Sequence, residues 1–335
     1  MSRANLRDVA ERAGVSVRTV SNVVNTPDVV ATTTRERVQR AIEELGYRPN
    51  IAARQLRRGR GDVIGLVVPE IDSPYFAELA AHVVRAAEEL GWTVLVEQTD
   101  GDPARERDLL DGARGHGVDG VVFSPWSLTP AEVSRRAGAP PVVMLGEQAG
   151  FGHVDRVAID NQAAAREATT HLVASGRRRI AAVGLQPHLS NETARHRRAG
   201  YREALAAGGL AVDTALEVPV DRLHHADGVR AMEALLDLAE PPDAVFCFTD
   251  QLALGALRAC ATRGLRVPED VALVGFDDIE AGRYSVPALT TVAPDKQRLA
   301  ELALATLAER IADRSLPGRD LVVPHTLVVR ESAPA

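Results

Sequence analysis

Residues 6–25 read LRDVAERAGVSVRTVSNVVN, and their apolar positions recur with a helical period. Leucine, valine and alanine fall on one face of a first short helix, which Gly14 can end with a tight turn. Ser16 then provides the side chain of an N-cap for a second helix. Two short helices joined by a glycine turn form a helix-turn-helix. The start of the chain therefore predicts a small helical domain.

The second predicted helix has two faces of different chemistry. At 100° per residue, three valines point to one side, and the opposite stripe consists of Val17, Arg18, Ser21 and Asn22. In a DNA major groove, arginine suits guanine, asparagine suits adenine, and a small apolar group suits the thymine methyl. The residues placed for phosphate contacts are Ser16, Thr19 and Asn25. This helix is therefore a candidate for reading DNA.

The charge distribution supports a polyanionic partner. Residues 1–60 contain twelve arginines and six carboxylates, so the net charge of this segment is +6. The remaining residues carry a net charge of −13, which gives −7 for the whole chain. A basic first sixth on an acidic body indicates that this end binds a polyanion. The alternative is a solvated basic tail, which would require the segment to lack the helical pattern described above.

Two more helices are expected before residue 60. Thr33 and Glu36 have the spacing of a capping box for a third helix, which Gly46 would end. Residues 49–59 can form about two helical turns, and so short a helix is marginal by itself because nucleation is costly. We therefore expect this linker to fold only against a partner.

From Val63 onward, short apolar runs typical of buried parallel strands alternate with amphipathic helical stretches. The runs are residues 64–68, 92–96, 120–123, 142–145, 157–159, 180–183, 244–247 and 271–274. The fold class predicted is α/β, with two doubly wound halves whose parallel strands end at a common cleft. The last four residues, 332–335, are expected to be disordered.

Several classes of protein are excluded by composition and motifs. Hydrophobic residues make up 45% and charged residues 25%, and no apolar run is long enough to span a membrane. Cys247 and Cys260 lie in apolar surroundings without metal-ligand spacing, and His224-His225 suggests a polar surface pair rather than a metal site. No nucleotide-binding or hydrolase motif is present, so we expect neither an enzyme nor a cofactor. The N-terminus lacks the apolar core of a signal peptide, which predicts a cytoplasmic protein.

Three strings carry a resemblance to a known family: LRDVAERAGVS (6–16), TRERV (34–38) and ELGYRPN (44–50). They resemble the headpiece of the LacI/GalR family of bacterial transcriptional regulators. The resemblance implies a helix-turn-helix headpiece over 1–47, a hinge helix or linker over 48–60, and a periplasmic-binding-protein-like ligand-binding and dimerisation domain over 61–331. Its N-lobe would comprise about 61–159 and 291–321, and its C-lobe about 160–290 and 322–331. The chain would cross between lobes near 159–161, 289–293 and 321–325. Because Ala31 replaces the serine usual before the third helix, we expect the cap at Thr32 or Thr33.

The function implied is that of a ligand-responsive repressor of genes for sugar uptake or catabolism. It would bind a pseudo-palindromic, double-stranded operator as a homodimer and be released by a small-molecule effector, such as a sugar or sugar derivative. The DNA-binding residues implied are Leu6, Ser16, Val17, Arg18, Thr19, Ser21, Asn22, Asn25, Thr34, Asn50, Ala53, Leu56 and Arg57. Leu56 would wedge into the minor groove, and the alternative is that it packs onto the sensor domain.

The effector-binding residues expected are Ser73, Phe76, Trp126, Arg197, Thr249 and Asp277. The resemblance assigns Arg197 to contact with the effector and Asp277 to accepting hydrogen bonds from ligand hydroxyls. The alternatives are a solvent-exposed salt bridge for Arg197 and a turn cap for Asp277. The rings of Phe76 and Trp126 follow predicted strands, where they could stack on a sugar or a base or simply pack between lobes. The rival functions are a solute-binding protein and an enzyme. A solute-binding protein would give the basic headpiece no role, and no catalytic motif supports an enzyme.

Overall fold

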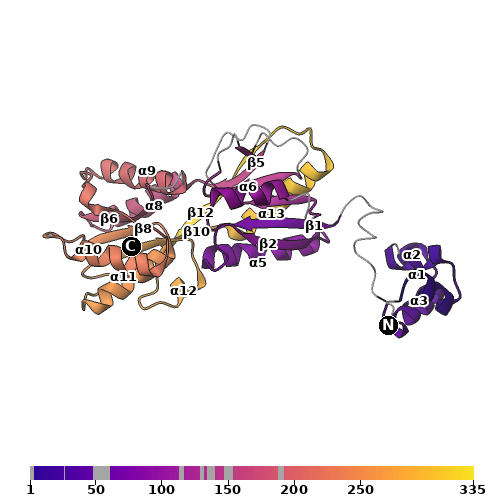
Figure 1. Ribbon diagram of the computed structural model, residues 1–335. Coiled ribbons are helices and arrows are strands. Elements are labelled where there is room, and N and C mark those ends of the chain that lie inside the picture. The colour runs from indigo at the N-terminus through magenta and orange to yellow at the C-terminus, as the bar shows by residue number, and fades with distance from the viewer. Residues whose placement is uncertain are drawn as a thin grey trace. The chain divides into compact units, whose positions relative to one another are not determined.

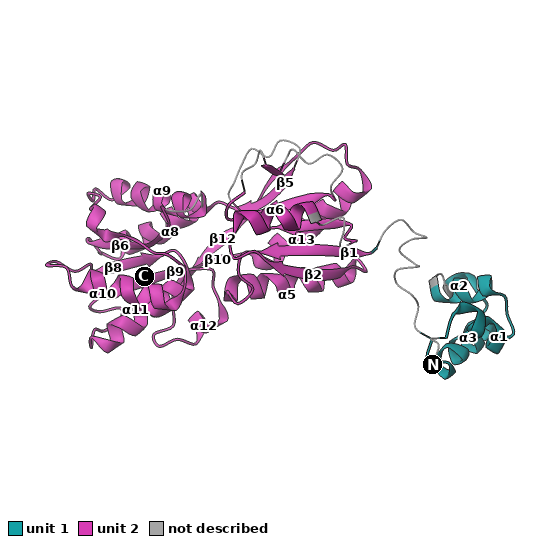
Figure 2. Ribbon diagram, viewed as in Figure 1, with its two compact units in different colours: residues 1–61 teal, residues 62–335 magenta. Residues whose placement is uncertain are grey.

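The computed structural model describes residues 4–25, 27–47, 61–112, 117–128, 132–133, 140–146, 154–187 and 192–335 (Figure 1). The chain divides into two compact units, residues 1–61 and residues 62–335 (Figure 2). The first unit contains the predicted headpiece. The second contains two α/β lobes.

The first unit is built from helices α1 (Leu6–Ala13), α2 (Val17–Asn25) and α3 (Thr32–Glu44), with a 3-10 turn η1 (Pro27–Val29) before α3. Asn5 caps α1, because its side chain accepts from the N–H groups of Arg7 and Asp8 while the Asp8 carboxylate accepts from the Asn5 N–H. Gly14 ends α1 with a φ of +64°. One fully buried valine from each helix (Val9, Val20 and Val38) forms the core of the unit.

The expected capping box of α3 is wrong. The helix begins at Thr32, and Ala31 occupies the N-cap position without a side-chain hydrogen bond. The Ala31 carbonyl accepts from the N–H groups of Thr34 and Arg35 instead. Burial of Val38 and Ala41 stabilises this helix in the absence of a side-chain cap, which would contribute about 1 kcal/mol.

The first lobe contains, within the described residues, a six-stranded parallel sheet in the order β11-β5-β4-β3-β1-β2. Its strands are β1 (Val63–Val68), β2 (Thr93–Gln98), β3 (Gly120–Phe123), β4 (Val142–Leu145), β5 (Asp155–Ile159) and β11 (Asp320–Val323). Helices α5 (Pro74–Glu89), α6 (Pro103–Gly112) and α13 (Lys296–Ala312) belong to this lobe (Figure 1). Helix α13 packs against α5 and against β3, β4 and β5.

The second lobe contains, over the same described ranges, a six-stranded sheet in the order β12-β10-β9-β8-β6-β7. Its strands are β6 (Ile180–Leu185), β7 (Glu217–Pro219), β8 (Ala244–Cys247), β9 (Ala272–Phe276), β10 (Thr290–Pro294) and β12 (His325–Val328). Its helices are α8 (Asn161–Ala174), α9 (Glu192–Ala207), α10 (His225–Leu236), α11 (Asp250–Thr262) and the short α12 (Glu280–Arg283), with a 3-10 turn η2 (Thr214–Leu216).

One strand departs from the expected parallel sheets: β12 is antiparallel to β10. Only Pro324 separates β11 from β12, so the chain continues almost directly from the first sheet into the second. It therefore enters the second sheet from the cleft side, against the direction of β10.

The chain crosses between the lobes three times. The crossings lie at Asp160, between β10 and α13, and at Pro324. The second crossing comes later than the expected 289–293, because β10 stays paired with β12 as far as Pro294. Residues 290–294 thus belong to the second lobe, and residues 322–323 remain in the first.

The C-terminal residues are part of the second lobe, so the expected disorder of 332–335 is wrong. Ser332 is fully buried; its Oγ donates to the Leu273 carbonyl at 2.6 Å and accepts from the Thr290 N–H at 2.8 Å. Ala333 is also buried, and its carbonyl accepts from the Thr290 hydroxyl at 3.1 Å. The tail closes the core between β9 and β10, although its composition alone suggests a loose end.

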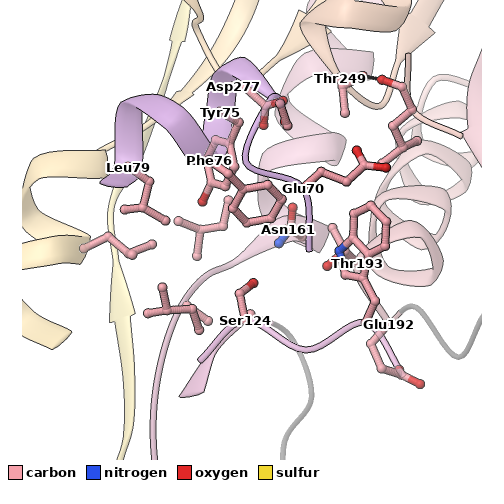
Figure 3. Close-up of a pocket in the computed structure, with 18 of the residues that line it drawn as sticks. Glu70, Tyr75, Phe76, Leu79, Ser124, Asn161, Glu192, Thr193, Thr249 and Asp277 are labelled. Carbon is pink, nitrogen blue, oxygen red and sulfur yellow. Dashed lines mark hydrogen bonds between the residues drawn. The ribbon is translucent and has the colours of Figure 1, made fainter. Parts of the chain in front are cut away.

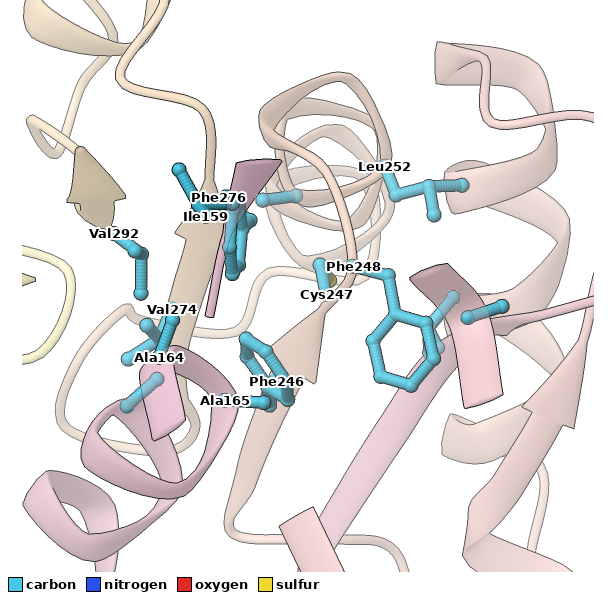
Figure 4. Packing of buried hydrophobic residues seen from close by; sticks show 14 of the residues in the cluster. Ile159, Ala164, Ala165, Phe246, Cys247, Phe248, Leu252, Val274, Phe276 and Val292 are labelled. Atoms are coloured by element: carbon cyan, nitrogen blue, oxygen red, sulfur yellow. The ribbon is translucent and has the colours of Figure 1, made fainter. Parts of the chain in front are cut away.

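The core of the second lobe packs helix against sheet through small residues. Figure 4 shows Phe246, Val274 and Val292 of the sheet beside Ala164 and Ala165 of α8. This rigid packing holds the carboxyl ends of β8 and β9 in place, and the loops that follow them form part of the site described next.

Candidate functional site

Helix α2 exposes two of the four residues of the expected outward stripe. Val17 is 40% exposed and Arg18 is exposed, whereas Val20 and Val23 are buried in the core of the unit. The Ser16 Oγ accepts from the Thr19 N–H at 3.1 Å, as a helix N-cap does. An apolar side chain and an arginine therefore stand on an accessible helix face, as a major-groove reader requires.

The other expected DNA contacts differ in exposure. Side chains that are half-buried in the first unit are Leu6, Thr19, Ser21, Asn22 and Thr34. Leu6 packs against the core of that unit. The structure does not describe the side chain of Asn25 or any residue of the predicted hinge, 48–60. The predictions for Asn50, Ala53, Leu56 and Arg57 therefore lie outside the described residues.

In the second unit, loops at the carboxyl ends of both sheets surround one cavity of about 990 Å³, its open mouth included (Figure 3). All six expected effector residues line it: Ser73, Phe76, Trp126, Arg197, Thr249 and Asp277. Phe76 comes from the first turn of α5 and Trp126 from the loop after β3, both in the first lobe. Thr249 and Asp277 follow β8 and β9 in the second lobe. The cavity thus lies where open α/β sheets usually bind ligands.

Arg197 of α9 is buried at the base of this cavity. Its Nε donates to Asn161 Oδ1 at 2.7 Å, and its Nη1 donates to the Phe248 carbonyl. The guanidinium carbon lies 3.4 Å from the centroid of the Phe276 ring, an arrangement typical of a cation–π contact. The alternative of a solvent-exposed salt bridge is wrong, because the side chain is only 7% exposed.

Asp277 follows β9 directly and is buried, with a φ of +112°. Its N–H donates to the Val292 carbonyl at 2.8 Å, and its carbonyl accepts from Lys296 Nζ at 2.7 Å. Burial raises the pKa of the Asp277 carboxyl to about 7, although nearby Arg197 and Lys296 favour the charged form. Near neutral pH, this carboxyl group can therefore either accept or donate a hydrogen bond.

Asp250, the first residue of α11, holds the loop that carries Asp277. Its Oδ1 accepts from the Thr291 hydroxyl at 2.6 Å and its Oδ2 from the Ile279 N–H at 2.9 Å. Burial, with Asp277 nearby, raises the pKa of Asp250 well above its ordinary value. Sequence reasoning missed this role, because an aspartate at the start of a helix usually serves only that helix.

Glu106 of α6 holds the loop that carries Trp126, another role that the sequence did not reveal. The buried carboxylate accepts the N–H groups of Trp126 (2.7 Å), Ser127 (3.1 Å) and Leu128 (2.9 Å). Burial raises the pKa of Glu106, and these three hydrogen bonds oppose that shift. A single buried carboxylate therefore orders the end of β3.

His224 joins the two lobes at the edge of the cavity. Its Nε2 lies 2.9 Å from Oε2 of Glu70, which follows β1 in the opposite lobe and lines the cavity. The expectation of a polar surface pair is thus wrong for His224, which is half-buried, whereas His225 is exposed. Within the described residues, no group of histidine, cysteine, aspartate and glutamate could hold a metal ion.

Comparison with known proteins places both units in one family. Residues 5–50 match the model described as "Bacterial regulatory proteins, lacI family", and residues 169–333 match "Periplasmic binding protein-like domain". The HTH-type transcriptional repressor CytR of Escherichia coli (strain K12) is 32% identical over 99% of this chain and 97% of that protein. The chain belongs to the LacI family. It is accordingly a DNA-binding, ligand-responsive transcriptional regulator and not an enzyme.

Solved structures agree with this family assignment. The lac repressor dimer bound to operator and the anti-inducer ONPF matches with a TM-score of 0.87, at 28% identity, over 100% of both chains. The CelR–cellobiose complex matches with a TM-score of 0.74, at 35% identity, over 98% of this chain and 100% of that one. Of the helices in the described residues, none has the length and apolar character needed to cross a membrane.

Proposed function

We propose that this LacI-family regulator is a dimeric repressor that reads a pseudo-palindromic operator with helix α2. The observation that carries this proposal is the accessible face of α2, where Val17 and Arg18 are exposed while Val20 and Val23 anchor the helix in the core. A dimer would present two such helices to two half-sites. The lac repressor is a dimer on its operator, which supports the same arrangement here. Operator binding would place the protein in the cytoplasm.

The residues between the two units would form a hinge whose folding depends on the state of the ligand-binding domain. In this proposal residues 48–60 fold into a helix on the operator, and Leu56 of each protomer wedges into the central minor groove. Pyrimidine–purine steps kink most easily, so the centre of the operator is expected to be a C-G step. Asn50, Ala53 and Arg57 would contact DNA beside it.

We also propose that a sugar or sugar derivative binds in the cavity between the lobes and releases the operator. Arg197 and Asp277 would anchor its polar groups, while Phe76 and Trp126 would bound its apolar face. The structural neighbour CelR is described in complex with cellobiose, which supports a sugar as the class of effector. The regulated genes would then serve sugar uptake or catabolism.

The test uses the full chain and a random-sequence DNA selection, followed by mobility-shift titration of the selected site. The expected result is a two-fold symmetric site, bound as a dimer and weakened by an effector. Selection of no symmetric site, or binding of DNA without sequence preference, would contradict the proposed operator reading. The DNA upstream of the gene offers an independent probe, since repressors of this kind often bind beside their own targets.

A further inference from the structure

We propose that the cavity selects an uncharged, polyhydroxylated ligand, a neutral mono- or disaccharide, and rejects phosphorylated or carboxylated sugars. This inference rests on the proposed function, because it concerns the ligand of the same cavity. It follows from the charges, the helix ends and the hydrogen-bonding groups that the described residues place around the cavity.

Carboxyl groups outnumber cations along the described lining. Glu70, Glu192 and Asp277 line the cavity, and Arg197 is the one lysine or arginine among the lining residues that the structure describes. The guanidinium of Arg197 already donates to Asn161 Oδ1 and to the Phe248 carbonyl. A phosphate would therefore meet three carboxyl groups and one cation that already binds protein atoms.

The partners of two of these carboxylates leave the cavity acidic. Glu192 pairs with Arg195, whose side chain is 72% exposed. Water therefore screens the positive charge of Arg195, which compensates the Glu192 carboxylate only weakly. The Glu192 carboxylate also lies 3.9 Å from His196 Nε2. Glu70 contacts His224 through Oε2. The partner of Glu70 is thus an imidazole rather than a lysine or an arginine.

Side chains of the protein already cap two of the helix N-termini at the cavity. A helix N-terminus is the usual place for a phosphate, because its free N–H groups and its dipole attract anions. Here Asp160 caps α8 through the Ala163 N–H, Thr249 caps α11 through the Leu252 N–H, and Glu192 is the first residue of α9. Helix α5 begins with Pro74, which has no N–H to donate. The caps of α8 and α11, and the acidic start of α9, thus disfavour a bound anion at these three ends.

The remaining lining suits a neutral sugar. Hydroxyl and amide groups come from Ser73, Ser124, Asn161, Thr193, Thr249 and Gln251. Carboxylates accept strong hydrogen bonds from sugar hydroxyls, and aromatic rings cover the C–H faces of a pyranose. Tyr75 and Phe76, whose ring centroids lie 5.1 Å apart, supply a fixed aromatic wall (Figure 3).

The test compares matched neutral and anionic probes on the full chain by isothermal titration calorimetry. The probes are glucose, cellobiose, maltose and lactose, the 6-phosphate of each sugar, glucuronate, and inorganic phosphate. We expect at least one neutral sugar to bind, and its phosphate to bind at least about tenfold more weakly, because like charges are costly in a desolvated site. Tighter binding of any anionic probe, or binding of no neutral probe, would overturn the inference.

Two variants test whether the carboxylates cause this selectivity. In Glu192→Gln, we expect the preference for the neutral sugar over its phosphate to fall several-fold. Glu89→Gln removes an equal charge from an exposed site at the end of α5, and the preference should not change. An unchanged preference in Glu192→Gln would assign the selectivity to other groups and overturn this account.

Mobility shifts with the selected operator separate this inference from the proposed function. An anionic sugar that binds and releases the operator would overturn the charge selectivity and leave the regulator function intact. Failure to bind any symmetric operator would instead contradict the proposed function.

Discussion

Arg197 has a structural role as well as its proposed ligand contact. Truncation to alanine would leave the Asn161 side chain and the Phe248 carbonyl without this donor, and would remove the cation from the Phe276 ring. A buried polar group left unpaired costs roughly 1–3 kcal/mol. We therefore expect Arg197→Ala to lower the melting temperature and also to weaken effector binding by roughly ten- to 150-fold. Calorimetry and thermal melts on both proteins test this, and equal effector affinity would show that Arg197 is only structural.

The carboxyl group of Asp277 should make stability depend on pH in a particular direction. Its pKa is about 7 in the folded chain, against an ordinary value of 3.8. Between these values the folded chain binds more protons than the unfolded chain, so the free energy of unfolding falls as pH rises. Asn tolerates the positive φ of this position and cannot ionise.

Asp277→Asn should therefore gain stability relative to the unsubstituted chain as pH rises from 5 to 8. Thermal melts at several pH values measure this difference. The pKa of Asp250 is raised as well. As pH rises, the unsubstituted chain therefore loses stability through both carboxyl groups, and the variant loses it only through Asp250. Parallel pH profiles for the two proteins would show that Asp277 does not titrate in this range.

The sequence pattern alone predicted the lining of the cavity only where residues follow strands, whereas Arg197 of α9 was expected from the family resemblance. Ser73, Phe76, Trp126 and Asp277 follow apolar runs, and parallel strands end at a common edge, so their gathering in one cavity could be predicted. The supporting residues Glu106 and Asp250 could not. Each acts on a loop distant in the sequence, and no local pattern encodes such a contact.

At the scale of elements, helix α2 gives a prediction about base recognition. Arg18→Ala should lose roughly 1–3 kcal/mol of discrimination at one guanine in each half-site. Arg40→Ala provides a matched control, because Arg40 is exposed on α3 and its loss removes the same charge. DNA selection on both variants measures base preference at each position. An unaltered preference in Arg18→Ala would exclude this residue from base reading.

Helices α10 and α11 of the second lobe depend on glycine for their close approach. A Cβ at Gly228 of α10 would lie 2.1 Å from the Leu252 carbonyl oxygen of α11, which is backbone and cannot rotate away. Gly228→Ala should therefore destabilise the lobe by several kcal/mol, beyond the usual 1–3 kcal/mol for overpacking. In Gly65→Ala the new Cβ would lie at an ordinary 3.5 Å from Val121, so little change is expected. Denaturant unfolding measures both, and equal stability would contradict the close packing.

Elements with a strong period were predictable, and elements at the lobe crossings were not. Helices α1 and α2 and the buried strands of both sheets follow from apolar spacing. Strands β10, β11 and β12 each lie beside a crossing, and β11 and β12 are also partly exposed. Their pairing, including the antiparallel β12, depends on partners far apart in the sequence, as does burial of the tail at Ser332.

At the scale of the whole molecule, an effector can act only through the arrangement of the two lobes. It changes operator affinity by no more than its preference for one arrangement over another. The chain crosses between the lobes at three places, and side-chain contacts also join the two lobes beside the cavity. Glu78 of α5 accepts from the Glu280 N–H at 3.0 Å, and His224 contacts Glu70 at 2.9 Å.

The contact between His224 and Glu70 should therefore tune operator binding from a distance. The chain matches the operator-bound lac repressor with a TM-score of 0.87, and we infer that the lobe arrangement with this contact is the one that binds DNA. Loss of the contact should then disfavour that form. We expect His224→Ala to weaken operator binding by a few-fold to about tenfold, since one partly exposed, charge-assisted hydrogen bond is lost. His225→Ala is the matched control, because His225 is the next residue in the chain and its side chain is exposed. Mobility-shift titrations of both variants, with and without the neutral sugar that binds most tightly, measure the change. If both variants bind the operator as the unsubstituted chain does, the contact does not participate in coupling the cavity to the DNA.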